Sequence, residues 1–329
     1  MNLKEEILKL KSELDVTVVA HYYQRDEVFE LADITGDSLE LARKAKDTDS
    51  KFVVFCGVGF MGESVKILSP EKRVLMPRIA CCAMARMIDE GYFEENLKQL
   101  NEAGIKNEDI LPITYINSSA RVKARVGMMG GMVCTSSNAY KIIEKGLKSG
   151  KKIFFVPDRC LGQNFAKSLG LKSAVVGDGS DLNEADVICY NGFCSVHQQF
   201  NIDDIDFYRE KYPGILVAVH PECDPAVCDK ADFVGSTSQL IKYITELPID
   251  QKVVVGTEFN MVNRLREKNT YILSSTKPEC PTMNETTLQH LYDTLKSIKD
   301  DKISPLVEIE VDEDTRNWAK IALQRMFEI

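Results

Sequence analysis

The chain has 329 residues, of which 44% are hydrophobic and 28% are charged, and its net charge is −9. This length exceeds one ordinary hydrophobic core and suits two or three domains of roughly 100 to 150 residues. The negative charge argues against a surface that binds nucleic acid or an anionic membrane, because both need clustered lysine and arginine.

Residues 1–16 predict an amphipathic helix, because Leu3, Ile7, Leu10 and Leu14 fall on one face. The segment lacks the apolar core of a signal peptide. No apolar run approaches the roughly 20 residues that a membrane-spanning helix needs. We therefore expect a cytoplasmic protein without a membrane or nucleic-acid partner, whose ten cysteines are free thiols or metal ligands.

One pattern then occurs three times with a spacing near 100 residues. An apolar run ends in a polar motif, a helix opens with a hydroxyl residue, a second apolar run ends in a turn, and a cysteine closes the copy. The first repeat has apolar runs at 16–20 and 52–55, and it contains His21-Tyr22-Tyr23, Gly36-Asp37-Ser38, Gly57-Val58-Gly59 and Ala80-Cys81-Cys82.

The other two repeats follow the same order. The second has apolar runs at 110–114 and 153–156, and it contains Tyr115-Ile116-Asn117, the helix opening at 134–138, Pro157-Asp158-Arg159 and Cys194. The third has apolar runs at 215–219 and 253–255, and it contains His220-Pro221-Glu222, Gly235-Ser236-Thr237, Gly256-Thr257-Glu258 and Cys280.

Near-continuous apolar strands that alternate with helices indicate parallel sheets covered on both faces. The sequence thus predicts an α/β protein of three similar three-layer αβα domains, at residues 1–105, 106–205 and 206–311. A C-terminal helix at 312–329 is expected to complete the first domain. Ligands of such sheets bind beyond the carboxyl ends of the strands, where each repeat has its polar motif.

Hydroxyl residues at helix starts form ready anion sites, although each alone is more often a simple N-cap. Such residues are Ser38, Ser136, Ser236 and Thr237. The strand ends supply groups that can transfer protons, namely His21, Tyr23, Tyr115, His220 and Glu222. A single tyrosine there is usually structural, whereas the chain has only four histidines and two occupy equivalent strand ends.

The cysteines divide by position. Cys223 and Cys228 favour a zinc site only weakly, because no second close pair accompanies them. Cys56, Cys160 and Cys189 lie in or beside apolar segments and are expected to be small buried hydrophobes, while Cys134 fits either role. Cys82, Cys194 and Cys280 each close a repeat, so together they could hold a metal centre with one open position. Spacing alone does not establish this centre, because no local cluster motif is present.

In order and spacing these motifs resemble the quinolinate synthase family over nearly the whole chain, and further matches are Tyr115-Ile116-Asn117-Ser118-Ser119, Gly192-Phe193-Cys194-Ser195-Val196-His197 and Cys280-Pro281-Thr282-Met283. The resemblance implies three related α/β domains arranged as a triangle around a central [4Fe-4S] cluster. Cys82, Cys194 and Cys280 would be its ligands, and one iron would stay open to the substrate.

The resemblance also implies an activity, the condensation of iminoaspartate with dihydroxyacetone phosphate, with loss of phosphate and two waters, to quinolinate for pyridine nucleotide synthesis. L-aspartate oxidase or aspartate dehydrogenase would supply the iminoaspartate. The implied substrate-binding residues are His21, Ser38, Asn117, Ser136, His220 and Thr237, with Ser236 adding a donor. The implied proton-transfer groups are Tyr23, Tyr115 and Glu222.

Some positions depart from the family pattern. The chain has Cys81-Cys82 where the family usually has one cysteine, and Cys82 is chosen because Ala83-Met84 aligns with the usual Pro-Met. Tyr190 stands where many members have tryptophan, and Cys160 where many have asparagine. Two alternatives stay open: another [4Fe-4S] hydro-lyase acting on a small carboxylic acid, and a non-catalytic regulator that binds a phosphosugar.

Overall fold

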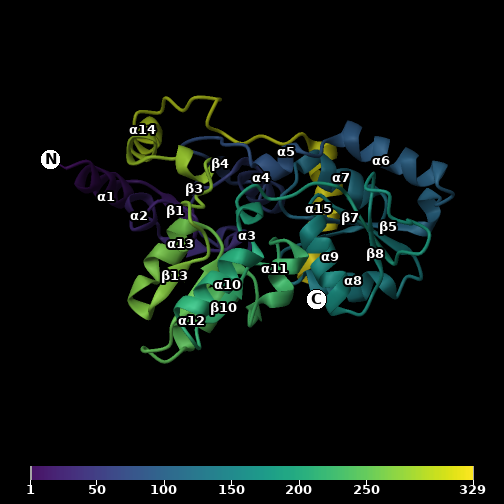
Figure 1. The fold of residues 1–329 in the computed structure, drawn as a ribbon. Coiled ribbons are helices and arrows are strands. Elements are labelled where there is room, and N and C mark those ends of the chain that lie inside the picture. The colour runs from purple at the N-terminus through teal and green to yellow at the C-terminus, as the bar shows by residue number, and fades with distance from the viewer. Residues whose placement is uncertain (1, 329) are drawn as a thin grey trace.

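The computed structural model describes residues 2–328 and contains three separate parallel sheets (Figure 1). The first sheet has the order β2-β1-β3-β4, with β1 Val16–His21, β2 Ile34–Gly36, β3 Phe52–Cys56 and β4 Arg73–Leu75. The second has the order β6-β5-β7-β9-β8, with β5 Ile110–Tyr115, β6 Met132–Cys134, β7 Lys152–Val156, β8 Ser173–Val175 and β9 Val187–Cys189.

The third sheet has the order β11-β10-β12-β13, with β10 Leu216–Val219, β11 Phe233–Val234, β12 Val253–Gly256 and β13 Thr270–Ile272. In each sheet the first strand of the repeat pairs with both the second and the third. This shared strand order confirms the predicted α/β class.

Helices connect the strands, and none in residues 2–328 combines the length and apolar character that a membrane crossing requires. Their bounds are α1 Leu3–Glu13, α2 Asp26–Phe29, α3 Ser38–Lys46, α4 Gly59–Leu68, α5 Ala83–Arg86, α6 Glu90–Glu102, α7 Ala120–Met128, α8 Ala139–Leu147, α9 Arg159–Ser168, α10 Ile202–Lys211, α11 Pro225–Lys230, α12 Thr237–Glu246, α13 Phe259–Arg264, α14 Leu288–Lys299 and α15 Glu313–Phe327. Short 3₁₀ turns lie at Asn107–Asp109, His197–Gln199, Arg266–Lys268 and Met283–Glu285.

The helix starts correct part of the sequence analysis. Helix α3 is capped by Asp37, whose side chain accepts from the backbone of Leu39 and Glu40, so Ser38 is its first helical residue. Helix α12 is capped by Ser236. Ser136 does not open a helix, because it lies in a turn ahead of α8, which begins at Ala139. At α3 and α12, the side chain that accepts from the free backbone N–H groups of the first turn therefore decides where the helix begins.

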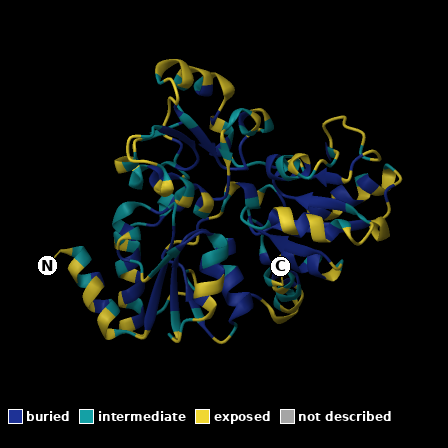
Figure 2. Cartoon of the chain, turned by 90° about the horizontal axis from the view of Figure 1, so that it is seen from below, coloured by how far each residue is buried: buried dark blue, intermediate teal, exposed yellow. Residues whose placement is uncertain are grey.

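The buried parts of the chain form three groups of strands around the centre of the molecule (Figure 2). One large hydrophobic cluster runs from the first sheet into the second, and it joins Val53 to Ile113 and Phe155. The third sheet has separate clusters on its two faces, one around Val254 and one around Val255. The first and second sheets therefore share one hydrophobic cluster, whereas the clusters of the third sheet include few side chains of the other repeats, among them Tyr22, Tyr23 and Phe200.

Several helices pack across the predicted domain limits. Phe93 of α6 contacts Phe154 of β7, with ring centroids 5.6 Å apart. Leu291 of α14 lies in one hydrophobic cluster with Ile7 of α1, so this helix covers the first sheet. Helix α15 packs on α7, β6 and α4, between the first two sheets. The domain limits at residues 105 and 311 stay a prediction. They would have to be refined at α6 and α14, because each of these helices packs on the sheet of another predicted domain.

Candidate active site

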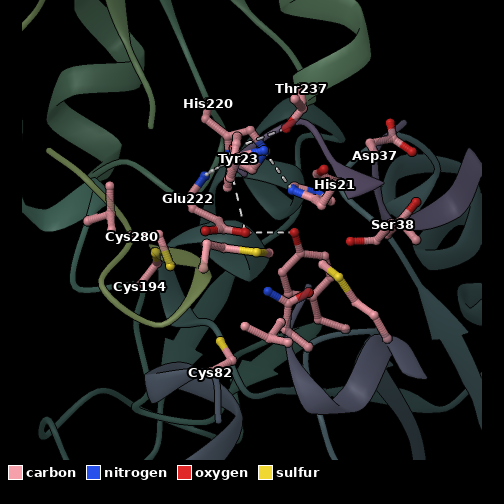
Figure 3. A pocket seen from close by; sticks show the side chains of 18 of the residues that line it. His21, Tyr23, Asp37, Ser38, Cys82, Cys194, His220, Glu222, Thr237 and Cys280 are labelled. Carbon is pink, nitrogen blue, oxygen red and sulfur yellow. Dashed lines mark hydrogen bonds and ion pairs between the residues drawn. The ribbon is translucent and has the colours of Figure 1, made fainter. Parts of the chain in front are cut away.

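The carboxyl ends of the first strands of all three sheets open into one cavity (Figure 3). The predicted residues that line it are His21, Tyr23, Ser38, Cys82, Tyr115, Asn117, Ser136, Cys194, His220, Glu222, Thr237 and Cys280. Ser236 is the exception, because it is fully buried and its hydroxyl caps α12 by accepting from Gln239. The structure thus brings together residues that lie more than 250 positions apart in the sequence.

His21 and His220 occupy equivalent positions with equivalent hydrogen bonds. The backbone N–H of Tyr23 donates to Nδ1 of His21 at 3.1 Å, and the backbone N–H of Glu222 donates to Nδ1 of His220 at 3.3 Å. An accepting Nδ1 leaves the proton of a neutral imidazole on Nε2. Burial lowers the pKa of both histidines to about 3. Both rings are therefore neutral donors at neutral pH.

These two histidines predict a loss of stability in acid. The unfolded chain binds protons at a histidine pKa near 6.5, while the folded chain stays neutral down to about 3. The contribution of these two imidazoles to the free energy of unfolding is therefore fully present above pH 6.5 and is lost as the pH is lowered. The loss is about 1 kcal/mol for each imidazole between pH 7 and pH 5.5. Urea unfolding of the cluster-free protein at both pH values measures this loss. His21→Gln should remove about half of it, and an equal loss in the variant would contradict the assignment.

Glu222 lies at the centre of a second network. It is buried, and its Oε1 accepts a hydrogen bond from the hydroxyl of Tyr115 at 2.6 Å. Its Oε2 lies 2.9 Å from Nδ1 of His197, at ion-pair distance. Burial alone would raise the pKa of Glu222, but His197 and the donated hydrogen bonds outweigh burial and lower this pKa to about 2. Glu222 is therefore an ionised acceptor inside the cavity.

A chain of polar contacts continues from His197 to Tyr23. Nε2 of His197 lies 3.0 Å from the hydroxyl oxygen of Thr257, which lies 3.0 Å from the hydroxyl oxygen of Tyr23. The Tyr23 hydroxyl also contacts that of Thr237 at 3.0 Å. These contacts, together with the 2.9 Å approach of Glu222 to His197, place polar groups at short intervals between the two ends of the cavity, an arrangement suited to proton transfer.

The two tyrosines keep their protons at neutral pH. Burial, followed by the negative charge of Glu222, raises the pKa of both Tyr23 and Tyr115 well above the usual value for a phenol. A buried, protonated phenol can donate a hydrogen bond or a proton to a departing oxygen. Both side chains therefore suit the role of acids.

His197 and Thr257 are site residues that the sequence analysis did not select. His197 stands three residues after Cys194 and is one of only four histidines, which is the signal that could have identified it. Thr257 lies in a turn and is fully buried, and nothing in its local sequence distinguishes it from a structural threonine. Only the fold brings its hydroxyl between His197 and Tyr23.

Asn117 shows that the cavity has room for a ligand group. Its Oδ1 is buried and has no hydrogen-bond partner among the residues that the structure describes. An unpaired buried amide oxygen costs roughly 1 to 3 kcal/mol. A hydroxyl or amine of a bound molecule would remove this cost.

Cys82, Cys194 and Cys280 come from the three repeats and are half-buried in the cavity wall, on the side of Glu222 opposite Ser38 (Figure 3). All three are free thiols. Burial raises the pKa of Cys194 well above its usual value, and the negative charge of Glu222 and the nearby sulfurs of Cys82 and Cys280 add to this rise. Three such sulfurs in one place are costly as thiolates unless a metal centre compensates them, so this donor set fits an iron-sulfur cluster.

The adjacent Cys81 differs from Cys82. Cys81 is exposed and is absent from the cavity wall, whereas Cys82 is half-buried and lines the cavity. The geometry therefore favours Cys82 as the ligand of the first repeat, in agreement with the alignment of Ala83-Met84.

A second possible metal-binding group overlaps the first. Cys194, His197 and Glu222 each offer one ligand atom, and these atoms lie within 4.8 Å of one another. In residues 2–328 this is the one group of three or more such side chains with that spacing. Cys223 and Cys228 therefore lack a third ligand in the described chain, and the zinc interpretation of this pair has no support.

The other cysteines behave as small apolar side chains. Cys56, Cys134 and Cys189 are fully buried, and each is the last residue of its strand. Cys160 is buried on α9, and Cys228 is half-buried on α11. The prediction for Cys56, Cys160 and Cys189 is thus confirmed in terms of burial.

Comparison with known proteins gives consistent matches over the whole chain. The family model described as quinolinate synthetase A protein matches residues 5–328. A quinolinate synthase of Helicobacter pylori (strain HPAG1) is 54% identical, and the alignment covers 100% of this chain and 98% of that protein. Quinolinate synthases of Streptomyces coelicolor and Acidobacterium capsulatum are 42% and 40% identical, over 94% and 100% of this chain and 84% and 93% of those proteins.

Proposed function

The chain belongs to the quinolinate synthase family of enzymes of NAD biosynthesis, and from this premise we propose its substrates, cofactor and residue roles. We propose that it condenses iminoaspartate with dihydroxyacetone phosphate, with loss of phosphate and two waters. It would act in the cytoplasm and receive iminoaspartate from an aspartate oxidase or dehydrogenase. The observation that carries this proposal is the convergence of three thiols and the Glu222 network in one cavity.

The proposed cofactor is a [4Fe-4S] cluster held by Cys82, Cys194 and Cys280. When bound, its open iron supplies Lewis acidity toward a substrate hydroxyl or carboxylate. The half-buried position of the three sulfurs and their origin in three repeats support this ligand set.

The proposed substrate contacts are neutral donors. The Nε2–H groups of His21 and His220 can bind carboxylate or phosphate oxygens. Ser38 and Thr237, the first residues of α3 and α12, add hydroxyls near helix N-termini, where the helix dipole favours anions. Asn117 and Ser136 would complete the set from the second repeat.

The proposed proton-transfer groups follow from the network. Phosphate loss, imine condensation and dehydration all need protons delivered to departing oxygens or removed from the substrate. Tyr23 would deliver a proton and recover it through Thr257 and His197, while the ionised carboxylate of Glu222 faces Nδ1 of His197. Tyr115, which donates to Glu222, would serve as a second acid.

The activity is tested with anaerobically purified holoenzyme and freshly generated iminoaspartate plus dihydroxyacetone phosphate. We expect one phosphate released for each pyridine dicarboxylate formed. A hydro-lyase would instead dehydrate a hydroxy acid without releasing phosphate. A phosphosugar-binding regulator would bind dihydroxyacetone phosphate without turnover, and either outcome would contradict the proposal.

A further inference from the structure

In each strand-end loop of the site, one side chain donates hydrogen bonds to two backbone carbonyl oxygens. These two carbonyls lie on either side of one cavity residue. The loops are residues 22–24, 116–118 and 221–223, and the flanked residues are Tyr23, Asn117 and Glu222. We call the donating side chains loop clamps.

The clamp of the third loop is Asn164 of α9, which belongs to the second repeat. Its Nδ2 donates to the carbonyl oxygens of Pro221 at 2.8 Å and Cys223 at 2.9 Å. Both partners are acceptors only, so the amide nitrogen must face them. Asn164 therefore fixes the backbone on either side of Glu222 from a different repeat.

The clamp of the first loop is Arg264, the last residue of α13 in the third repeat. Its guanidinium donates to the carbonyl oxygens of Tyr22 and Gln24, the latter at 3.0 Å. It also pairs with Asp26 at 2.7 Å and lies over the ring of Phe29. The backbone around Tyr23 is thus held from the third repeat.

The second loop is held by a pair of side chains. Lys123 of α7 is fully buried, and its Nζ donates to the carbonyl oxygens of Ile116 and Ser118, the former at 2.8 Å. Glu63 of α4, in the first repeat, accepts from the backbone N–H of Ala120 at 2.8 Å, at the start of the same helix α7. The loop around Asn117 is therefore also tied to a neighbouring repeat.

The three clamps follow the internal repeat in a cyclic order. Helices α4, α9 and α13 each follow the third strand of a repeat, and their N-caps are Val58, Asp158 and Glu258. Asn164 and Arg264 occupy the same position relative to these caps, and Glu63 lies one residue earlier. Helix α9 thus holds the third loop and α13 the first, whereas α4 contacts the start of α7, which directly follows the second loop.

We propose that Asn164, Arg264 and Lys123 are positioning residues, which hold the backbone on either side of a cavity residue. Asn164 and Arg264 act from the helix of another repeat, whereas Lys123 acts from α7 of its own repeat, whose start is held by Glu63 of the first repeat. This inference rests on the proposed roles of Tyr23, Asn117 and Glu222. The clamp at Asn164 adds to the direct contacts of Glu222 with Tyr115 and His197, because it fixes the backbone from which the Glu222 side chain projects. A shift of about 1 Å in such a group can lower the rate about a hundredfold.

The first test is Asn164→Leu, which keeps the branched arrangement of the side-chain heavy atoms and removes both donated hydrogen bonds. In the holoenzyme we expect kcat to fall roughly ten- to a hundredfold with KM changed by less than about threefold. Amide hydrogen exchange at Glu222 and Cys223 should rise by about tenfold or more, while iron content stays unchanged. Gln163→Ala is the matched control, because its side chain makes no hydrogen bond within the described residues, and it should leave both readouts unchanged.

The second test uses Arg264, whose loop contains Tyr23 and directly follows His21, the last residue of β1. Arg264→Met should lower kcat and raise KM by about tenfold each, and Arg264→Lys should recover only part of both, because an ammonium group keeps a donor for the carbonyls but lacks the fork of the guanidinium. Equal loss in the two variants would overturn the positioning role.

The outcomes separate this inference from the proposed function. If Glu222→Gln is inactive but Asn164→Leu keeps full kcat or normal exchange in residues 220–223, the clamp inference is overturned while the role of Glu222 stands. If Glu222→Gln itself stays active, the proposed role of Glu222 fails first, and raised exchange in Asn164→Leu would then report a clamp without a catalytic purpose, which also overturns the inference.

Discussion

Replacing Cys82 by alanine is expected to abolish the iron-sulfur absorbance and the turnover together, while replacing the adjacent Cys81 leaves both nearly intact. Cys82 lines the cavity with Cys194 and Cys280, whereas Cys81 is exposed outside it. A cluster with only two thiolates left has lost a ligand that the cavity cannot replace, because no further cysteine lines its wall in the described chain. Visible absorbance and activity of the anaerobically purified variants measure the effect.

The same result is expected for Cys194→Ala and Cys280→Ala. Cys228→Ala is the control, because Cys228 lies on α11 and is absent from the cavity wall. A cluster retained in Cys280→Ala would show that the ligand set is wrong. A cluster lost in Cys81→Ala but kept in Cys82→Ala would move the ligand by one residue.

Replacing Glu222 by glutamine is expected to preserve the cluster and lower kcat by about a thousandfold, within the usual range for an acid-base group. The change keeps the shape of the side chain and removes the charge that accepts from Tyr115 and faces His197. Without that charge, the proton pathway toward Tyr23 loses the carboxylate that can accept a proton at its Glu222 end. Steady-state kinetics and iron content of the same preparation separate loss of chemistry from loss of cofactor.

Tyr23→Phe should behave in the same way, because it removes the hydroxyl at the other end of the pathway. Glu285→Gln provides the control for a lost carboxylate, since Glu285 pairs with Arg78 at the surface. A fully active Glu222→Gln enzyme would remove this residue from the proton-transfer groups.

The regular parts of the fold could be predicted because burial determines them locally. All six residues of β1 are buried, and the apolar run at 16–20 marks this strand to within one residue. The repeat of polar motifs at strand ends placed twelve predicted residues in the cavity wall, since parallel strands end at the same edge of a sheet. The helix start at Ser38 was predicted correctly, although Asp37 is its cap, whereas the start at Ser136 was wrong, because α8 begins at Ala139 after Asn138.

The remaining features depend on contacts between distant segments. Strand β11 has two residues and β2 has three, too few for a period of alternation to be visible. The positions of α6 and α14 follow from packing against the second and first sheets, which their own amphipathic patterns do not specify. Thr257 joins the site only because His197 and Tyr23 from other repeats lie on either side of it.

Iron and acid-labile sulfide analysis of the anaerobically purified natural chain tests the central claim, a three-thiolate cluster between the three repeats, most directly. About four iron and four sulfide per chain are expected for a [4Fe-4S] cluster. Protein without iron and sulfide, or with a single zinc ion on Cys194, His197 and Glu222, would contradict it.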